Sequence, residues 1–164
     1  MKVINEINKG FLISFVIICF VSSLTYITYG HLKAGYIVTL PPKVVTIAQY
    51  IFAGISILQL MAVFNVIYKG IFDDKAIDHI SKILEESNDK LLKRFPSSDA
   101  TIVKGCKLTY DINFTFVLYG LSMAFVGADK VTFASFLFLA MISTFITWLW
   151  TKSKATKYYQ CKSS

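Results

Sequence analysis

Four stretches without a charged residue recur along the chain, separated by polar segments. They cover residues 11–29, 44–68, 112–127 and 131–151. At a rise of about 1.5 Å per residue, helices over these stretches are roughly 28, 37, 24 and 31 Å long. The hydrocarbon core of a bilayer is about 30 Å thick. The pattern predicts one all-α, polytopic membrane domain over residues 1–164, with a four-helix transmembrane bundle.

The third stretch is the shortest, and two starting points are open for it. A helix that begins near Leu108 rather than Ile112 is longer, but it draws Asp111 toward the membrane interface. Residues 128–130 leave room for only a tight turn, so we expect the third and fourth spans to form an antiparallel hairpin. The first connection contains Pro41 and Pro42, which predict a stiff, extended entry to the second span.

The segment 69–111 is long for a connection, and its first part has the pattern of an amphipathic helix. Asp73 or Asp74 can cap this helix, and Pro96 stops it soon after Phe95. Possible i,i+4 ion pairs are Lys82–Glu86, Glu86–Lys90 and Asp89–Lys93. Its apolar face is the candidate partner-binding surface and consists of Ile77, Ile80, Leu84, Leu91 and Phe95.

Acidic and basic residues are nearly balanced on this helix, so attraction to lipid headgroups is weak. We therefore expect its apolar face to pack on protein, either on an extension of the third span or on a partner. Ser98 or Asp99 can cap a second helix, which continues from Ala100 into the third span. The segment 69–111 is thus predicted to form a cytoplasmic helical hairpin that turns at residues 95–98.

Composition supports lipid as the main solvent of this chain. Hydrophobic residues make up 55% and charged residues only 16%, whereas soluble domains carry about 25% charged residues. The net charge is +7, but the basic residues gather in particular connections, as determinants of topology do. We therefore expect the lipid bilayer as a partner and no nucleic acid.

The basic residues also predict an orientation. Of the 17 lysines and arginines, all but Lys33, Lys43 and Lys130 lie in the N-terminal tail, the segment 69–111 or the C-terminal tail. Basic residues near span ends remain cytoplasmic, so we expect both termini and the central segment on that side. The first apolar run exceeds the 7–15 residues of a signal peptide, and no small-x-small cleavage site follows it closely, which favours an uncleaved anchor.

Residues with catalytic or metal-binding potential are scattered. His31 and His79 fall on opposite sides of the predicted membrane. Cys19, Cys106 and Cys161 form no CxxC pair, and no phosphate-binding loop, GxSxG or HExxH motif occurs. We expect neither enzymatic activity nor a cofactor or metal.

Polar side chains within the spans are the candidate intramembrane contacts, namely Gln49, Gln59 and Asn65. Gln59 lies near the middle of the second span and most needs a partner. One interpretation is an interhelical hydrogen bond that stabilises the bundle. Another is a pore-lining or partner-binding group. Small residues at Gly54 and at Gly120 with Ala124 predict close packing, within the bundle or with another protein's span.

In length and topology, the chain resembles small bacterial inner-membrane immunity and exclusion proteins, some of which have four spans and two cytoplasmic ends. The resemblance implies a protein that protects a cell by binding an incoming toxin domain or transfer apparatus in the inner membrane. We accordingly expect a non-enzymatic protein that binds another membrane protein, or itself, to block or regulate it. The alternatives are an oligomeric channel or transporter subunit and an accessory subunit of a larger complex.

Overall fold

The computed structural model describes residues 2–35 and 40–163, and all regular elements in these ranges are helical. The all-α class is therefore confirmed. A short π-helix, Ile67–Ile71, extends α2, and a 3₁₀ turn, Lys90–Lys93, precedes α4. The α-helices are α1 (Lys2–Gly35), α2 (Pro42–Val66), α3 (Asp74–Glu86), α4 (Ser97–Asn113), α5 (Thr115–Phe125) and α6 (Lys130–Ser163).

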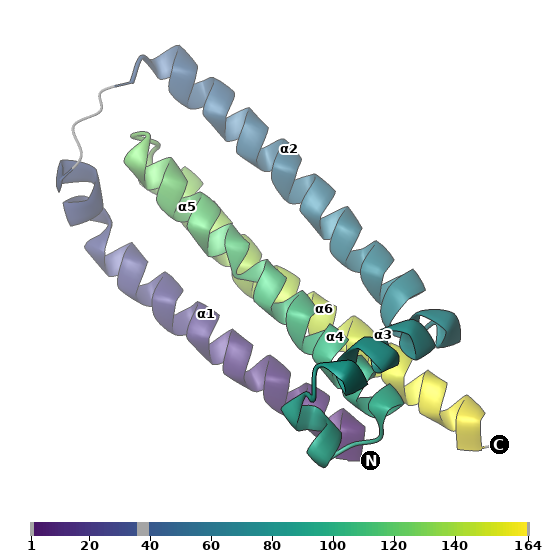
Figure 1. The fold of residues 1–164 in the computed structure, drawn as a ribbon. Coiled ribbons are helices and arrows are strands. Elements are labelled where there is room, and N and C mark those ends of the chain that lie inside the picture. The colour runs from purple at the N-terminus through teal and green to yellow at the C-terminus, as the bar shows by residue number, and fades with distance from the viewer. Residues whose placement is uncertain (1, 36–39, 164) are drawn as a thin grey trace.

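Three helices are long and apolar enough to cross a membrane, and they contain the first, second and fourth predicted spans. Their bounds are Lys2–His31, Pro42–Ile71 and Lys130–Lys162. The predicted third span, 112–127, is divided between the end of α4 and the 11-residue α5. These two helices continue nearly end to end (Figure 1). The chain is consistent with a membrane protein, while the fourth crossing stays a prediction.

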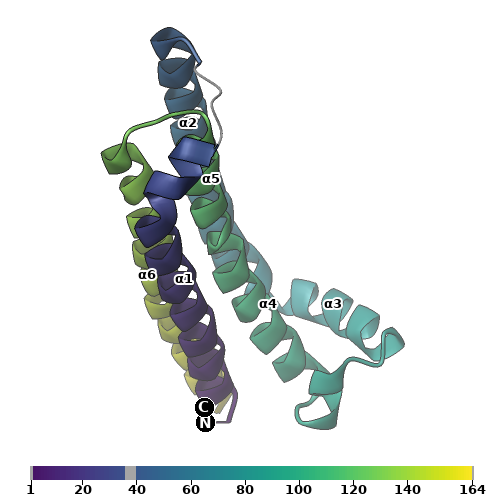
Figure 2. The same cartoon turned by 90° about the vertical axis from the view of Figure 1, so that its left-hand side faces the viewer.

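Helices α5 and α6 form the central antiparallel pair. The turn between them needs a left-handed residue, which Gly127 supplies at a φ of 83°. Helix α1 packs along one side of this pair, and α2 lies along the other side, as the two perpendicular views show (Figures 1 and 2). The first connection is shorter than predicted because α1 extends to Gly35, and Pro41 has the extended backbone expected before α2. Residues 36–39 of this connection lie outside the described part of the chain.

A large hydrophobic cluster lies at the end of the molecule that contains both termini, α3 and α4 (Figure 1). Ile7 of α1, Ile67 of the π-helix and Tyr110 of α4 are fully buried there. The rings of Phe11 and Trp148 stack with centroids 4.5 Å apart. This cluster ties the N-terminus, the segment 69–111 and the C-terminal half of α6 into one packed unit.

The prediction that the first helix of segment 69–111 continues to Phe95 is wrong. Helix α3 ends at Glu86, and Asn88 adopts a left-handed φ of 49°. The run Ser87-Asn88-Asp89 disfavours a helix because short polar side chains compete for backbone hydrogen bonds. Asp89 accepts a hydrogen bond from the Leu91 backbone N–H and starts the 3₁₀ turn. Its ion pair is with Lys104 on α4 rather than with Lys93.

The predicted helix caps are only partly realised. Asp73 occupies the N-cap position of α3, but its side chain makes no capping hydrogen bond. Helix α4 begins at Ser97, directly after Pro96, and thus earlier than a cap at Ser98 or Asp99 allows. The continuation of this second helix toward the third span is observed, with one interruption at Phe114.

Candidate functional site

Gln59 on α2 is hydrogen-bonded at both ends of its amide. Its Nε2 donates to the backbone carbonyl of Ile112, at 3.0 Å, and to Oγ1 of Thr115, at 2.6 Å. The Tyr119 hydroxyl donates to Gln59 Oε1, at 2.7 Å. We call Gln59, Ile112, Thr115 and Tyr119 the Gln59 clamp. It joins the middle of α2 to the junction of α4 and α5.

The clamp coincides with the interruption of the helix at Phe114. The Phe114 N–H bonds to the carbonyl of Asp111 and the Val117 N–H to that of Phe114, both at 3.0 Å, so the turn tightens to a 3₁₀ pattern. The Ile112 carbonyl instead accepts bonds from Gln59 and from the Thr115 hydroxyl. Gln59 and Thr115 therefore both donate hydrogen bonds to the backbone carbonyl at this break in the helix.

The other two candidate polar residues have different surroundings. Gln49 Nε2 donates to Thr132 Oγ1 on α6, at a long 3.4 Å. Asn65 is exposed near the end of α2. The three side chains therefore do not converge on a common face, and two of them bond to other helices of the same chain.

Sequence reasoning did not single out a second set of polar contacts, which joins α4 to α6. Tyr110 and Thr151 share a buried hydrogen bond of 2.7 Å between their hydroxyls. Asn113 Nδ2 donates to Thr147 Oγ1, at 3.1 Å, while Asn113 Oδ1 has no partner within the described part of the chain. The signal for these contacts in the sequence is the recurrence of Thr144, Thr147 and Thr151 at steps of three and four, which places them on one face of α6.

The predicted partner-binding face of the segment 69–111 is largely occupied by the chain itself. Ile77 and Leu84 are only 2% and 3% exposed, and α3 packs on α4. Leu91 and Phe95 are partly buried against the same core, whereas Ile80 is 40% exposed. Of the two partners considered for this face, the extension of the third span is the one that it contacts here.

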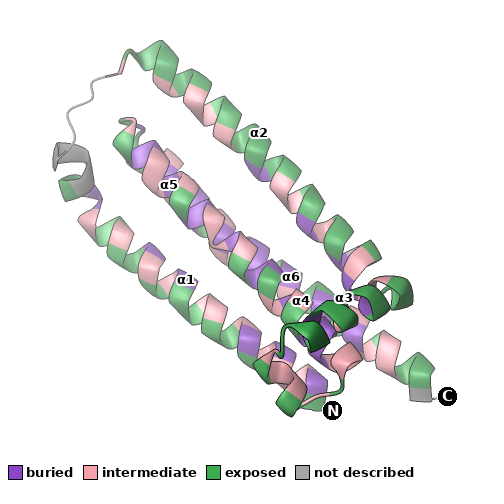
Figure 3. Cartoon of the chain, viewed as in Figure 1, coloured by how far each residue is buried: buried purple, intermediate pink, exposed green. Residues whose placement is uncertain are grey.

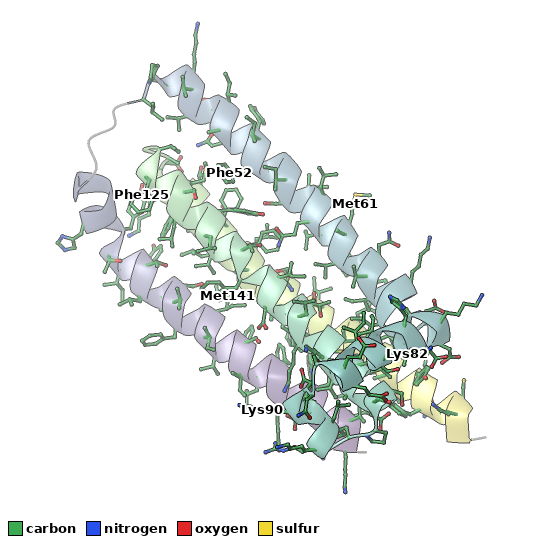
Figure 4. All side chains as sticks on the ribbon, in the orientation of Figure 1. Phe52, Met61, Lys82, Lys90, Phe125 and Met141 are labelled. Carbon is green, nitrogen blue, oxygen red and sulfur yellow. The ribbon has the colours of Figure 1, made fainter. Side chains whose placement is uncertain are left out.

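Helix α2 is the least buried of the long helices. Only Ser56 and Val63 are buried among its residues, and its surface is mostly exposed (Figure 3). Phe52 projects toward α5, while Met61 projects away from the other helices (Figure 4). One stripe of exposed residues at steps of three and four, which we call the α2 outer face, consists of Ile47, Tyr50, Gly54, Leu58, Met61 and Asn65.

The two small-residue sites differ in their surroundings. A Cβ added at Gly120 would lie 3.3 Å from Cβ of Phe136 and 3.4 Å from the Phe133 carbonyl oxygen, so this glycine permits close packing of α5 on α6. A Cβ added at Gly54 would have nothing within 4 Å. Gly120 therefore serves the fold, and Gly54 forms an open notch in the α2 outer face.

Within residues 2–35 and 40–163, no group of three His, Cys, Asp or Glu side chains is placed to hold a metal ion. Burial raises the pKa of the Cys106 thiol to about 12, which keeps it protonated at neutral pH. The pKa of Asp89 lies below its ordinary value because the Leu91 N–H and the Lys104 ammonium donate hydrogen bonds to its carboxylate.

Neither a protein-family model, nor a curated protein, nor a solved structure matches this chain.

Proposed function

We propose that the chain crosses the membrane four times, with both termini and the segment 69–111 in the cytoplasm. Support for the fourth crossing comes from the nearly continuous rod of α4 and α5, whose apolar part pairs with α6 along its length. The termini and α3 lie at one end of the molecule, and most basic residues belong to these segments (Figure 1). A bacterial inner membrane is the setting that the resemblance to immunity and exclusion proteins implies.

Within that topology, the function we propose is binding of a transmembrane helix of another membrane protein, which is thereby blocked or regulated. The observation that carries this proposal is the unpartnered α2 outer face with its notch at Gly54. Large side chains flank the notch, since Tyr50 is 76% and Leu58 is 66% exposed. A glycine between bulky residues lets a second helix backbone approach closely, which is how membrane helices associate.

Lipid alone explains this face less well than a protein helix does. Within a bilayer, van der Waals contact between helices replaces the hydrophobic effect as the driving force for association. This contact is closest where a glycine has no Cβ to hold the two backbones apart. Asn65, at the end of the same stripe, is exposed. A carboxamide on a membrane-facing surface is stabilised by a hydrogen bond to a neighbouring helix.

The alternative of an oligomeric channel receives less support from the geometry. A channel of this kind requires Gln49, Gln59 and Asn65 to line a pore. Gln59 is saturated by the clamp and Gln49 bonds to Thr132, so neither faces outward to line a pore between copies. An accessory role in a larger complex uses the same α2 outer face and differs only in its partner.

Site-specific crosslinking in native membranes tests the proposal. A photo-reactive amino acid at Leu58 should yield one discrete crosslinked product that contains a different membrane protein. The matched control position is Ile146 on α6, which is also exposed within an apolar stretch but lies off the α2 outer face. Gly54→Val should abolish the Leu58 product while the protein level is retained, because the branched side chain fills the notch.

Two results would overturn this proposal. Equal crosslinking at Leu58 and Ile146 would mean that the α2 outer face contacts only lipid and random neighbours. A product that contains only a second copy of this chain, together with ion conductance in liposomes, would favour the channel alternative.

A further inference from the structure

A groove of about 720 Å³ runs between α1 and α6, on the side of the molecule opposite α2. Its walls include Tyr26 and Ile27 from α1 and Phe138 and Met141 from α6. Met141 lies on the side of the α5–α6 pair that faces α1 (Figure 4). Among the described residues that line this groove, Lys130 is the one that carries a charge, and it belongs to the first turn of α6.

The charged group of the groove lies at one end. There, the Lys130 ammonium lies over the Tyr26 ring, 4.3 Å from its centroid. Away from this end the walls are uncharged: Phe138 is 60% exposed and Met141 is partly buried, and the lining also includes Ser22, Ser23 and Ser135. The ring holds the ammonium at the rim through a cation–π contact without neutralising its charge.

The length of the groove matches one leaflet of a bilayer. From Lys130 to Met141, α6 rises roughly 16 Å at about 1.5 Å per residue. Half of a hydrocarbon core of about 30 Å is about 15 Å. With Lys130 at the headgroup level, Met141 therefore lies near the bilayer midplane, and the groove accommodates an acyl chain over its whole depth.

We propose that this groove binds an anionic glycerophospholipid of the leaflet opposite the termini. Lys130 contacts the headgroup phosphate, and an acyl chain lies between Ile27 and Phe138. Asp129 is adjacent to Lys130, and one oxygen of its carboxylate accepts a hydrogen bond from the Thr132 backbone N–H, at 2.6 Å, at the start of α6. The Lys130 ammonium, placed over the Tyr26 ring at the end of the groove, is the cation that we expect to favour an anionic headgroup over a zwitterionic one.

This inference rests on the membrane placement proposed above but not on the α2 outer face. The groove is lined by α1 and α6, whereas that face belongs to α2, and α1 and α2 flank the α5–α6 pair (Figure 2). A lipid experiment on the purified chain contains no partner protein. Failure of crosslinking at Leu58 and failure of lipid binding are therefore distinguishable.

The test uses the purified full-length chain in detergent, with lipid adducts measured by native mass spectrometry. We expect phosphatidylglycerol to bind more tightly than phosphatidylcholine of the same acyl composition. Lys130→Gln should weaken phosphatidylglycerol binding roughly fivefold. This factor corresponds to the binding free energy that one lysine contributes near an anionic lipid surface. The same variant should weaken phosphatidylcholine binding less, because the choline cation offsets most of the attraction between Lys130 and the phosphate of that lipid.

Two further variants make the test specific. Lys43→Gln removes an exposed basic residue at the start of α2, outside the groove, and should have no effect on selectivity. Ala134→Phe fills the groove from α6 and should reduce adducts of both lipids. Equal affinity for the two lipids, or equal effects of Lys130→Gln and Lys43→Gln, would overturn the proposal and leave only non-specific annular lipid.

Discussion

Gln59 illustrates how a single polar residue connects helices at the scale of side chains. Its amide contacts one backbone carbonyl and two side-chain hydroxyls on α4 and α5. An interhelical hydrogen bond of this kind was one of two sequence-based interpretations, and the geometry agrees with it. The identity of the partners was not predictable, because the break at Phe114 that exposes the Ile112 carbonyl has no proline or glycine to mark it.

Replacement of Gln59 measures how much the Gln59 clamp contributes to the stability of the fold. Gln59→Leu should lower the free energy of unfolding in detergent by about 1–2 kcal/mol, since Ile112 and Tyr119 lose a partner in an apolar environment. Thermal unfolding of the purified variant provides the measurement, and Leu58 crosslinking should persist. Gln49→Leu is the control, with a smaller loss because its bond is long, at 3.4 Å. Equal losses for the two variants would contradict the role of the clamp.

At the scale of elements, the segment 69–111 shows where helix patterns and local chemistry compete. The apolar positions from Ile77 to Phe95 match one helical face, yet the helix ends at Glu86. Periodicity indicates which residues become buried, and Ile77 and Leu84 do. It does not indicate that Asn88 adopts a left-handed conformation or that Asp89 starts a new turn. Those features come from the short polar side chains of the Ser87-Asn88-Asp89 run and from the hydrogen bond that Asp89 accepts from the Leu91 N–H.

The pH dependence of stability should report the Asp89 contact. Its lowered folded-state pKa means that the contribution of this carboxylate is present above its unfolded pKa, about 3.9, and is lost as the pH falls through the folded-state value. The wild type should therefore melt at a higher temperature than Asp89→Asn at pH 7. This difference should narrow below about pH 4.

Thermal unfolding of both proteins across this pH range makes the comparison. Asp78→Asn is the matched control, an exposed carboxylate on the middle of α3. A constant difference between the wild type and Asp89→Asn down to pH 2 would exclude a role for the ionised Asp89 carboxylate.

At the scale of the whole molecule, the arrangement places distinct surfaces on opposite sides. Helices α1 and α2 flank the α5–α6 pair rather than completing a compact ring (Figures 1 and 2). The side with α1 carries the groove beside Lys130, and the side with α2 carries the unpartnered outer face. The two sites that we propose, one for a lipid and one for a partner helix, therefore belong to different surfaces of the chain.

Thiol labelling tests the orientation of this whole assembly. A membrane-impermeant maleimide added to intact cells should leave the protein unlabelled and should react with Cys161 after permeabilisation, because Cys161 is exposed near the C-terminus. Cys106 should stay unlabelled in both cases, since burial raises its pKa to about 12. Cys161→Ser is the control that assigns the label. Labelling of Cys161 in intact cells would reverse the proposed topology.

The sequence by itself determined the helical class, the three long apolar helices and the burial of Ile77 and Leu84 in the segment 69–111. These features are local, because hydrophobic runs and helical periodicity are set by neighbours along the chain. Only the tertiary structure decided that Gln59 pairs with Ile112 and Tyr119, that Gly120 is packed and that Gly54 is open. Each of these outcomes depends on which helix lies opposite, and a pattern along one helix does not specify its neighbour.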